Sequence, residues 1–421
     1  MMTLSRIKSI AIIILAVLTL YQTGFLWFVN ITNRNFLSVY LPFLQHTPVP
    51  EGVDRLVVPW RIITNHGNGR FSAQYNHLAQ ADAKRYSDII LSHLLQSGTF
   101  VSAFPANYEA ILSEPAFIFE YTFPMETEWF LQGFGLRSNV LNVPGLAAFR
   151  RVVVRPYYLT DSPDSPGLAQ IFFLCENGYS YEFSVNLPDN TDIGVVPSYS
   201  QKPNYTFIGK FVRQGKFSFN GIYTTNPYAN AHGAFFLDFV ENQVAPFFNN
   251  PASIRSIGGE NVWVYRDINT VVRYYETHVL EYVSYRAIDR STPSSFLNDF
   301  VAAVQFVEAD NLVINETYLA GFRKSDGQHI FYFNYVIGNM PLTMYPYPIT
   351  VTVDHGTVVR YRKSAFNFHV DETISLTANA DFNRIANLLD NDFKHIRLGY
   401  RMDSQDINKL YWLVDGLAFP L

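Results

Sequence analysis

The sequence predicts an α+β protein in which a single N-terminal transmembrane helix precedes an extracytoplasmic multidomain region with antiparallel sheets. Three observations lead to this prediction: an uncharged apolar stretch near the N-terminus, a hairpin pattern that occurs twice, and strand patterns separated by amphipathic helical stretches. Together, the second and third observations predict a duplicated β-β-α-β-β unit.

The uncharged stretch runs from Ile10 to Val29 and, at about 1.5 Å per residue, is long enough to cross the roughly 30 Å hydrocarbon layer of a membrane. A cleavable signal peptide has a shorter apolar core that ends at small residues, whereas this stretch ends in Trp-Phe-Val, so we predict an uncleaved anchor. Arg6 and Lys8 precede the stretch, and the positive-inside rule then places the N-terminus in the cytoplasm and the bulk of this single-pass chain outside the cell membrane.

Polar and small side chains lie on one side of the predicted span. Thr19, Gln22, Thr23 and Leu26 are spaced so that they share one helical face. Such side chains can pack or hydrogen-bond against a neighbouring helix inside the bilayer, although a glutamine in the outer half of a span can also reach the lipid headgroups. This face is a candidate transmembrane interface.

The string Thr-Val-Val-Arg-Tyr occurs twice, at 270–274 and 357–361, each time three residues after an aspartate. Alternating β-branched and aromatic residues on both sides of a turn predict a β-hairpin at each place. Further matches are the strand patterns 319–323 and 397–401, the strands after them at 330–336 and 410–414, and amphipathic helices at 294–308 and 379–389. The same order of elements in both copies favours a duplication.

The chain is predicted to divide into segments 1–9 (cytoplasmic stub), 10–29 (span), 30–50 (connector), 51–200 (N-terminal α+β domain), 201–340 (middle α+β domain with the first unit) and 341–421 (second unit). In the N-terminal domain the patterns predict a hairpin at 55–64 and 70–75, a helix at 76–96, and strands at 116–123, 151–159, 169–176 and 179–185. Strands near 206–224 and a helix near 234–248 are predicted in the middle domain, before the repeated units.

Composition and motifs argue against several classes of function. A net charge of −5 gives no basic nucleic-acid footprint, so we expect no nucleic-acid partner. The single cysteine, Cys175, lies in an apolar strand pattern and is expected to pack as a small hydrophobe, without an intrachain disulfide. Because hydrolase elbows and paired metal-binding histidines are absent from the sequence, we predict no enzyme activity, no catalytic residue, no metal and no cofactor.

Four arginines recur at corresponding strand positions: Arg273, Arg323, Arg360 and Arg401. Two interpretations are open. Charges that recur on exposed strands can reflect common ancestry and the protection of sheet edges, or they can form a face that binds a partner or ligand.

The parts of this chain resemble the YycH and YycI family, and YycH more than YycI. The resemblance is carried by the anchor after Ser5-Arg-Ile-Lys8, by Pro348-Ile-Thr-Val-Thr-Val-Asp-His-Gly-Thr-Val-Val-Arg-Tyr361, and by Ile396-Arg-Leu-Gly-Tyr400 followed by Tyr411-Trp-Leu-Val-Asp-Gly416. It implies PepSY-like units and a Gram-positive, membrane-anchored accessory protein. The implied partners are a WalK-like sensor histidine kinase that controls cell-wall metabolism genes and a sister YycI-like single-pass protein. The family offers no catalytic residues.

The leading hypothesis is therefore a non-enzymatic regulator of a two-component system that acts through transmembrane and ectodomain contacts. An alternative is an extracytoplasmic module that binds a cell-wall fragment, peptide or lipid between the repeated units, which the many tyrosines and phenylalanines would suit. A cell-wall hydrolase lacks every motif that its chemistry needs.

Overall fold

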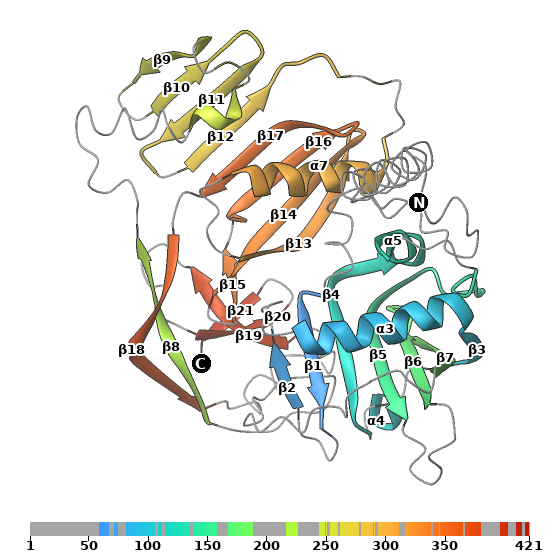
Figure 1. Ribbon diagram of the computed structural model, residues 1–421. Helices are drawn as coiled ribbons and strands as arrows, with labels where there is room; N and C mark the ends of the chain where they lie inside the picture. Colours follow the sequence, from blue (N-terminus) through green and yellow to red (C-terminus); the bar gives the residue numbers. More distant parts are fainter. Residues whose placement is uncertain are drawn as a thin grey trace, which may run out of the picture.

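The computed structural model is a sheet-rich α+β fold in which antiparallel sheets dominate and helices are few (Figure 1). It describes residues 59–66, 71–74, 81–105, 108–111, 114–134, 139–157, 167–187, 216–225, 244–248, 250, 253–259, 262–277, 279–288, 290, 294–310, 316–337, 340–344, 346–364, 367–379, 396–402, 410–414 and 417–420. The predicted span at 10–29 lies outside these residues. Within them, no helix is long and apolar enough to cross a membrane.

The N-terminal part forms a seven-stranded sheet in which every pairing is antiparallel. In sheet order its strands are β2 (Phe71–Gln74), β1 (Arg61–Asn65), β4 (Ala116–Glu126), β5 (Ala148–Tyr157), β6 (Gly167–Leu174), β7 (Tyr179–Leu187) and β3 (Thr99–Pro105). The helices of this part are α3 (Ala81–Ser97), α4 (Tyr108–Ile111) and α5 (Thr127–Gly133). The predicted hairpin, helix and four strands are all present, whereas β3 and α5 were not predicted.

Helix α3 lies across one face of this sheet, where Ile90, Leu91, Leu94 and Leu95 are buried. This burial follows the three- and four-residue spacing of its apolar side chains. The strands carry buried side chains on both faces, and the face opposite α3 includes a buried charge cluster. There, Glu120 accepts hydrogen bonds from the Arg61 Nε at 2.7 Å and the Arg151 Nε at 2.9 Å, so the buried carboxylate is neutralised from two neighbouring strands.

The C-terminal part forms a twelve-stranded sheet. Its main path is β21 (Leu417–Pro420), β20 (Leu410–Val414), β19 (Ile396–Met402), β15 (Met340–Met344), β14 (Gln328–Ile337), β16 (Ile349–Asp354), β17 (Thr357–Ser364), β12 (Val279–Ser284), β11 (Thr270–Tyr275), β10 (Val262–Arg266) and β9 (Arg255–Gly258), with β13 (Glu316–Ser325) on the free edge of β14. Only β15 and β19 pair in parallel. Helix α7 (Phe296–Ala309) and the short 3₁₀ helix η3 (Ala245–Phe247) belong to this part.

Both predicted hairpins are confirmed, as β10–β11 and as β16–β17. The second hairpin lies between strands of the first unit, because β17 pairs with β12 and β16 pairs with β14. The first unit also contains an unpredicted strand, β12, before its helix. Strands of both predicted units thus share one sheet, and the predicted boundary after residue 340 falls inside it, where β14 pairs with β15.

Two tight turns in this sheet use residues with positive φ. Asp326 and Gly327 join β13 to β14, and His355 and Gly356 join β16 to β17, with φ between 49° and 80°. Two consecutive residues of this kind give the turn whose twist matches that of the flanking strands. His355 is thus a turn residue, as its Asp-His-Gly context predicts.

A separate two-stranded sheet pairs β8 (Lys216–Thr225) with β18 (Asn367–Asn379). It joins a segment that precedes the first hairpin to one that follows the second. The predicted helix at 379–389 lies outside the described residues apart from its first residue, which ends β18. Most of the helix predicted at 234–248 is also outside them, and its last residues include η3.

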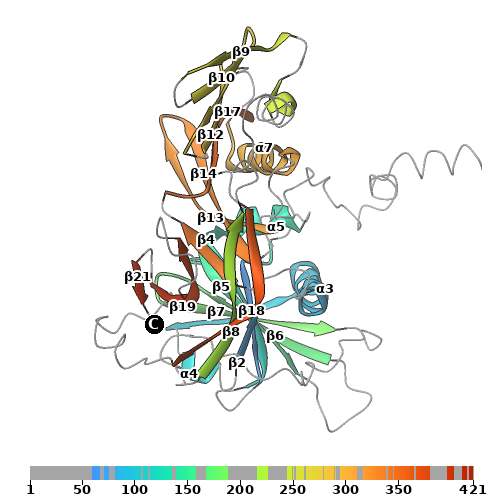
Figure 2. The same ribbon diagram turned by 90° about the vertical axis from the view of Figure 1, so that its left-hand side faces the viewer.

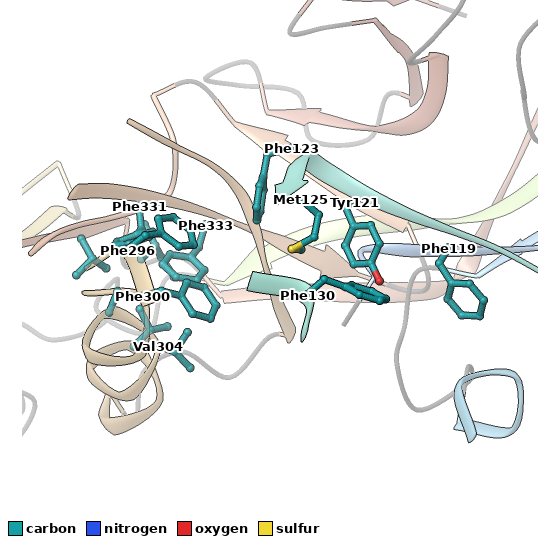
Figure 3. Packing of buried hydrophobic residues seen from close by; sticks show 14 of the residues in the cluster. Phe119, Tyr121, Phe123, Met125, Phe130, Phe296, Phe300, Val304, Phe331 and Phe333 are labelled. Atoms are coloured by element: carbon teal, nitrogen blue, oxygen red, sulfur yellow. The ribbon is translucent and has the colours of Figure 1, made fainter. Parts of the chain in front are cut away.

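One hydrophobic core runs from the first sheet to the second (Figure 3). Phe123 on β4 meets Phe322 on β13 with ring centroids 5.4 Å apart, and Trp129 on α5 stacks on Phe296 of α7 at 3.9 Å. The Thr122 hydroxyl also donates a hydrogen bond to the backbone carbonyl of Leu319. These contacts hold α7 and the edge of the second sheet against the first.

Candidate interaction surface

The second sheet has one face covered by α7 (Figure 2). The opposite face packs against the first sheet where Tyr318 of β13 and Val336 of β14 meet the Trp60 cluster, and no described helix or strand covers the rest of it. Side chains of the covered face, such as Tyr265, Tyr361 and Phe331, are buried at 0%, 1% and 0% exposure. Because side chains alternate along a strand, their neighbours point to the opposite side. We call that opposite side of strands β9 to β14, with β13, the outer face.

Cross-strand register places the side chains of the outer face in two rows, each crossing eight strands. The row nearer the hairpin turns consists of Arg255, Arg266, Val271, Val283, Arg360, Thr352, Ile330 and Arg323. The next row consists of Ile257, Val264, Arg273, Glu281, Arg362, Thr350, Tyr332 and Gly321. At about 4.8 Å per strand, each row extends over roughly 34 Å of a twisted surface.

The two rows contain six arginines and a single carboxylate, Glu281. Within the part of the chain that the structure describes, none of the six arginines forms an ion pair or a side-chain hydrogen bond, although the chain carries a net charge of −5. Arg255 and Arg266 even lie directly opposite each other, a pairing of like charges that destabilises a sheet. Local arrangements that cost stability are typical of functional surfaces.

Glu281 is the one acidic group of these two rows, and it already accepts a hydrogen bond. Its Oε2 accepts a hydrogen bond from the Tyr275 hydroxyl at 3.0 Å. Burial and this hydrogen bond raise the pKa of Tyr275, while nearby Arg273 opposes the rise. Glu281 also lies between Arg273 and Arg362 in the register, so it offsets part of their positive charge. In the row nearer the hairpin turns, every charged side chain is an arginine.

Three of the four predicted arginines come together on this face: Arg273, Arg323 and Arg360. Edge protection does not account for Arg273 and Arg360, because β11 and β17 are interior strands. Arg401 lies on β19, at the other end of the sheet, and only its backbone placement is described. The predicted transmembrane face of Thr19, Gln22, Thr23 and Leu26 is outside the described residues.

Sequence reasoning did not single out Arg255, Arg266 and Arg362. Alternation along β17 could have found Arg362, because it follows Arg360 by two residues and therefore shares its face. Arg266 needed the register of the β10–β11 hairpin, and Arg255 needed the pairing of β9, a strand that was not predicted.

The covered face contains two carboxylates that tie α7 to the second hairpin. Near the start of α7, Asp299 accepts hydrogen bonds from the Gly356 backbone N–H at 2.6 Å and the Ser294 hydroxyl at 3.1 Å, and it contacts His329 Nδ1 at 2.6 Å. Asp299 and His329 resemble part of a catalytic triad. However, the Ser294 hydroxyl donates to the aspartate and not to the histidine, so this arrangement positions no nucleophile.

At the other end of α7, Asp310 accepts hydrogen bonds from Lys363 Nζ at 2.6 Å and from the Tyr361 hydroxyl at 2.8 Å. All three residues are buried. Desolvation lowers the pKa of Lys363 to about 8, and the attraction of Asp310 opposes that shift. The two aspartates thus fasten both ends of one helix to the same hairpin.

Other chemical groups give no sign of a catalytic centre in the described part. Cys175 is 7% exposed, and burial raises the pKa of its thiol to about 11, which disfavours the reactive thiolate. Among the described residues, no three His, Cys, Asp or Glu side chains gather where they could hold a metal ion. The outer face is therefore the strongest candidate for function.

Comparison with known protein families, with characterised proteins and with solved structures finds no match for this chain. The class of protein is thus described by its fold and its surface: a sheet-rich α+β protein with an open, arginine-bearing sheet face.

Proposed function

We propose that this protein is a membrane-anchored, non-enzymatic regulator that acts by contact, with its bulk outside the cell. In this proposal, residues 10–29 span the membrane, and Thr19, Gln22, Thr23 and Leu26 pack beside the helices of a partner. The partners are a two-component sensor histidine kinase that controls cell-wall metabolism and a sister single-pass protein. The YycH-like sequence features motivate these partners, and PepSY-like duplicated units belong to the same proposal.

The outer face is the observation that carries the proposal. Six arginines that form no ion pair with another described residue, on strands from both predicted units, form a surface that suits a partner with complementary negative charge. Arginine and tyrosine are enriched in protein interfaces, where lysine is depleted, and both rows contain arginine without lysine. A contact surface of this kind supports a binding role better than a catalytic one.

Regulation by contact requires that the partner be bound more tightly in one of its states. The equilibrium of the kinase then shifts by the difference between the two binding free energies, and a coupling of about 1 to 3 kcal/mol is typical. The outer face can supply such a difference if the arginines reach carboxylates in only one kinase state.

The test is to isolate the full-length protein from its native membrane and to identify the proteins that are recovered with it. We expect a histidine kinase and a sister single-pass protein to be recovered with the wild type and to be lost when residues 10–29 are replaced by polyleucine. The double variant Arg273→Glu/Arg360→Glu should weaken recovery, whereas Lys324→Glu, a charge reversal on the other side of the sheet, should not. Recovery that is unchanged by both the polyleucine span and Arg273→Glu/Arg360→Glu would contradict the contact mechanism.

A second candidate function is the capture of an anionic cell-wall fragment, peptide or lipid. The same arginines favour it, because their planar guanidinium groups bind carboxylate or phosphate groups through two hydrogen bonds. Titration of the full-length protein with defined anionic wall fragments would support this alternative if saturable binding were lost in Arg273→Glu/Arg360→Glu.

A further inference from the structure

The turn between β10 and β11 presents an apolar side chain to solvent. Ile268 is 95% exposed and Tyr285, just after β12, is 63% exposed. The Tyr285 backbone N–H donates to the Asn269 carbonyl oxygen at 2.7 Å, so Tyr285 lies beside the residue that follows Ile268 in the turn. We call Ile268 and Tyr285 the tip; it lies at the turn side of the outer face, beyond Arg266.

The backbone of the tip is held in place by its own hydrogen bonds. Asp267 Oδ1 accepts from the backbone N–H of Asn269 at 2.8 Å and of Thr270 at 2.7 Å, and the Asp267 N–H donates to the Thr270 carbonyl at 3.0 Å. A turn fixed in this way loses little freedom when a partner binds, which favours affinity. The exposure of Ile268 is thus a feature of an ordered turn.

Three exposed arginines lie close to the tip in the sequence or in the strand register. Arg266 ends β10, Arg255 lies opposite it on β9, and Arg286 follows Tyr285 in the sequence. Apolar and aromatic anchors with arginines at their sides are typical of the energetically dominant parts of protein interfaces. An anionic membrane attracts lysine as well as arginine, so the use of arginine alone favours a protein partner.

The second hairpin shows how this fold covers a matching turn. There, the Gly356 backbone N–H donates to Asp299 at 2.6 Å, and the buried Phe296 lies one helical turn before that aspartate on α7. A carboxylate from a helix end therefore binds the backbone of this turn. In the first hairpin, the aspartate of the turn bonds to its own loop, and the isoleucine stays in solvent.

We propose that the tip docks into an apolar pocket with a rim of carboxylates on a partner protein. The proposal rests on the proposed function and adds the chemistry of the partner's surface. Ile268 and Tyr285 fill the pocket, and Arg255, Arg266 and Arg286 meet its acidic rim.

The test uses the full-length protein in its native membrane with a photo-crosslinking amino acid, benzoylphenylalanine, at position 268. The matched control carries it at Val101, which is 52% exposed on β3 of the other sheet. We expect an adduct at 268 but not at 101, and mass spectrometry should map it to an apolar partner segment flanked by aspartate or glutamate. The adduct should fall about tenfold in Arg255→Glu/Arg266→Glu, since like charges would then face each other, and should persist in Lys324→Glu.

Four outcomes would overturn the docking proposal: an adduct to lipid, an adduct between two copies of this chain, a yield no higher than at position 101, or a yield insensitive to the arginine reversals. If the kinase is recovered through the native span but position 268 gives no adduct, the proposed function stands and the docking proposal falls. An adduct with the expected properties to a different protein supports the docking and rejects the kinase as its target.

Discussion

Asp310 and Lys363 form a buried pair whose members depend on each other. Breaking such a pair leaves one buried charge without a partner, which is far more costly than the net contribution of the pair. We predict that Asp310→Asn lowers the free energy of unfolding by about 3 kcal/mol, measured by urea denaturation.

The control for this prediction removes both charges. In Asp310→Asn/Lys363→Met the apolar side chain replaces the buried cation, and we expect most of the stability to return. If the double variant is as unstable as Asp310→Asn alone, the loss arises from packing and not from the unpaired charge.

Lys363 also predicts a dependence of stability on pH. Its pKa is lowered from 10.5 to about 8 in the folded protein, chiefly by desolvation. Between these two pH values the unfolded chain holds the proton that the folded protein has lost, so this group makes the folded state more stable as pH rises. Wild-type stability should therefore rise relative to Lys363→Met over this window, in paired urea titrations; a parallel pH dependence would contradict the shift.

At the scale of elements, helix α7 begins with two different supports. Ser295 Oγ accepts a hydrogen bond from the Asn298 backbone N–H at 3.2 Å, which caps the helix, whereas Asp299 reaches the turn of the second hairpin. We predict that Asp299→Ala costs about 2 to 3 kcal/mol, since it removes the hydrogen-bond partner of the buried His329, of the Gly356 backbone N–H and of the Ser294 hydroxyl. It should also speed hydrogen exchange at the Gly356 amide.

Ser295→Ala provides the comparison, because it removes a cap without touching the hairpin. Ser295→Ala should lower the free energy of unfolding by about 1 kcal/mol. Hydrogen exchange at the Gly356 amide should then speed up only as much as this loss of global stability requires. Equal exchange in both variants would show that Asp299 does not fasten the turn.

Local elements were largely predictable from sequence, because their signals are local. Runs of β-branched and aromatic residues predicted β4 to β7. The last two strands are joined by Asn177-Gly178, a local turn signal, and Gly178 has φ of 82°. β3 was not predicted because it pairs with β7, which is distant in the sequence, so no hairpin pattern beside β3 marks it as a strand. The insertion of β16–β17 between β12 and β14 likewise depends on strand pairing between distant segments, which no local sequence pattern encodes.

The candidate surface was predictable in part for the same reason. Recurrence alone pointed to Arg273, Arg323 and Arg360, but the sequence could not show that these residues share one face. That conclusion depends on the register of eight strands, in which a shift of one residue would move a side chain to the covered side.

At the scale of the whole molecule, the two sheets are joined by aromatic contacts that involve α7. Trp129 stacks on Phe296 at 3.9 Å and meets Phe322 edge-on at 5.8 Å. We predict that Trp129→Ala separates the unfolding of the two parts, so that a single transition in denaturant becomes two when followed by far-ultraviolet and tryptophan signals. Retention of one coincident transition would mean that the remaining contacts suffice for cooperativity.

The distribution of charge over the molecule leads to the last prediction. A chain with a net charge of −5 places six arginines on one face, none of them in an ion pair with another described residue. That face therefore attracts an acidic partner while the rest of the molecule repels it. Screening shortens the reach of these charges from about 30 Å at 0.01 M salt to about 8 Å at 0.15 M. Partner association with the full-length protein should therefore slow steeply as salt is raised, and the rate should depend much less on salt in Arg273→Glu/Arg360→Glu. An equal salt dependence in the wild type and this variant would place the electrostatic contact elsewhere, because replacing two positive charges of the contacting face by two negative ones must flatten the response.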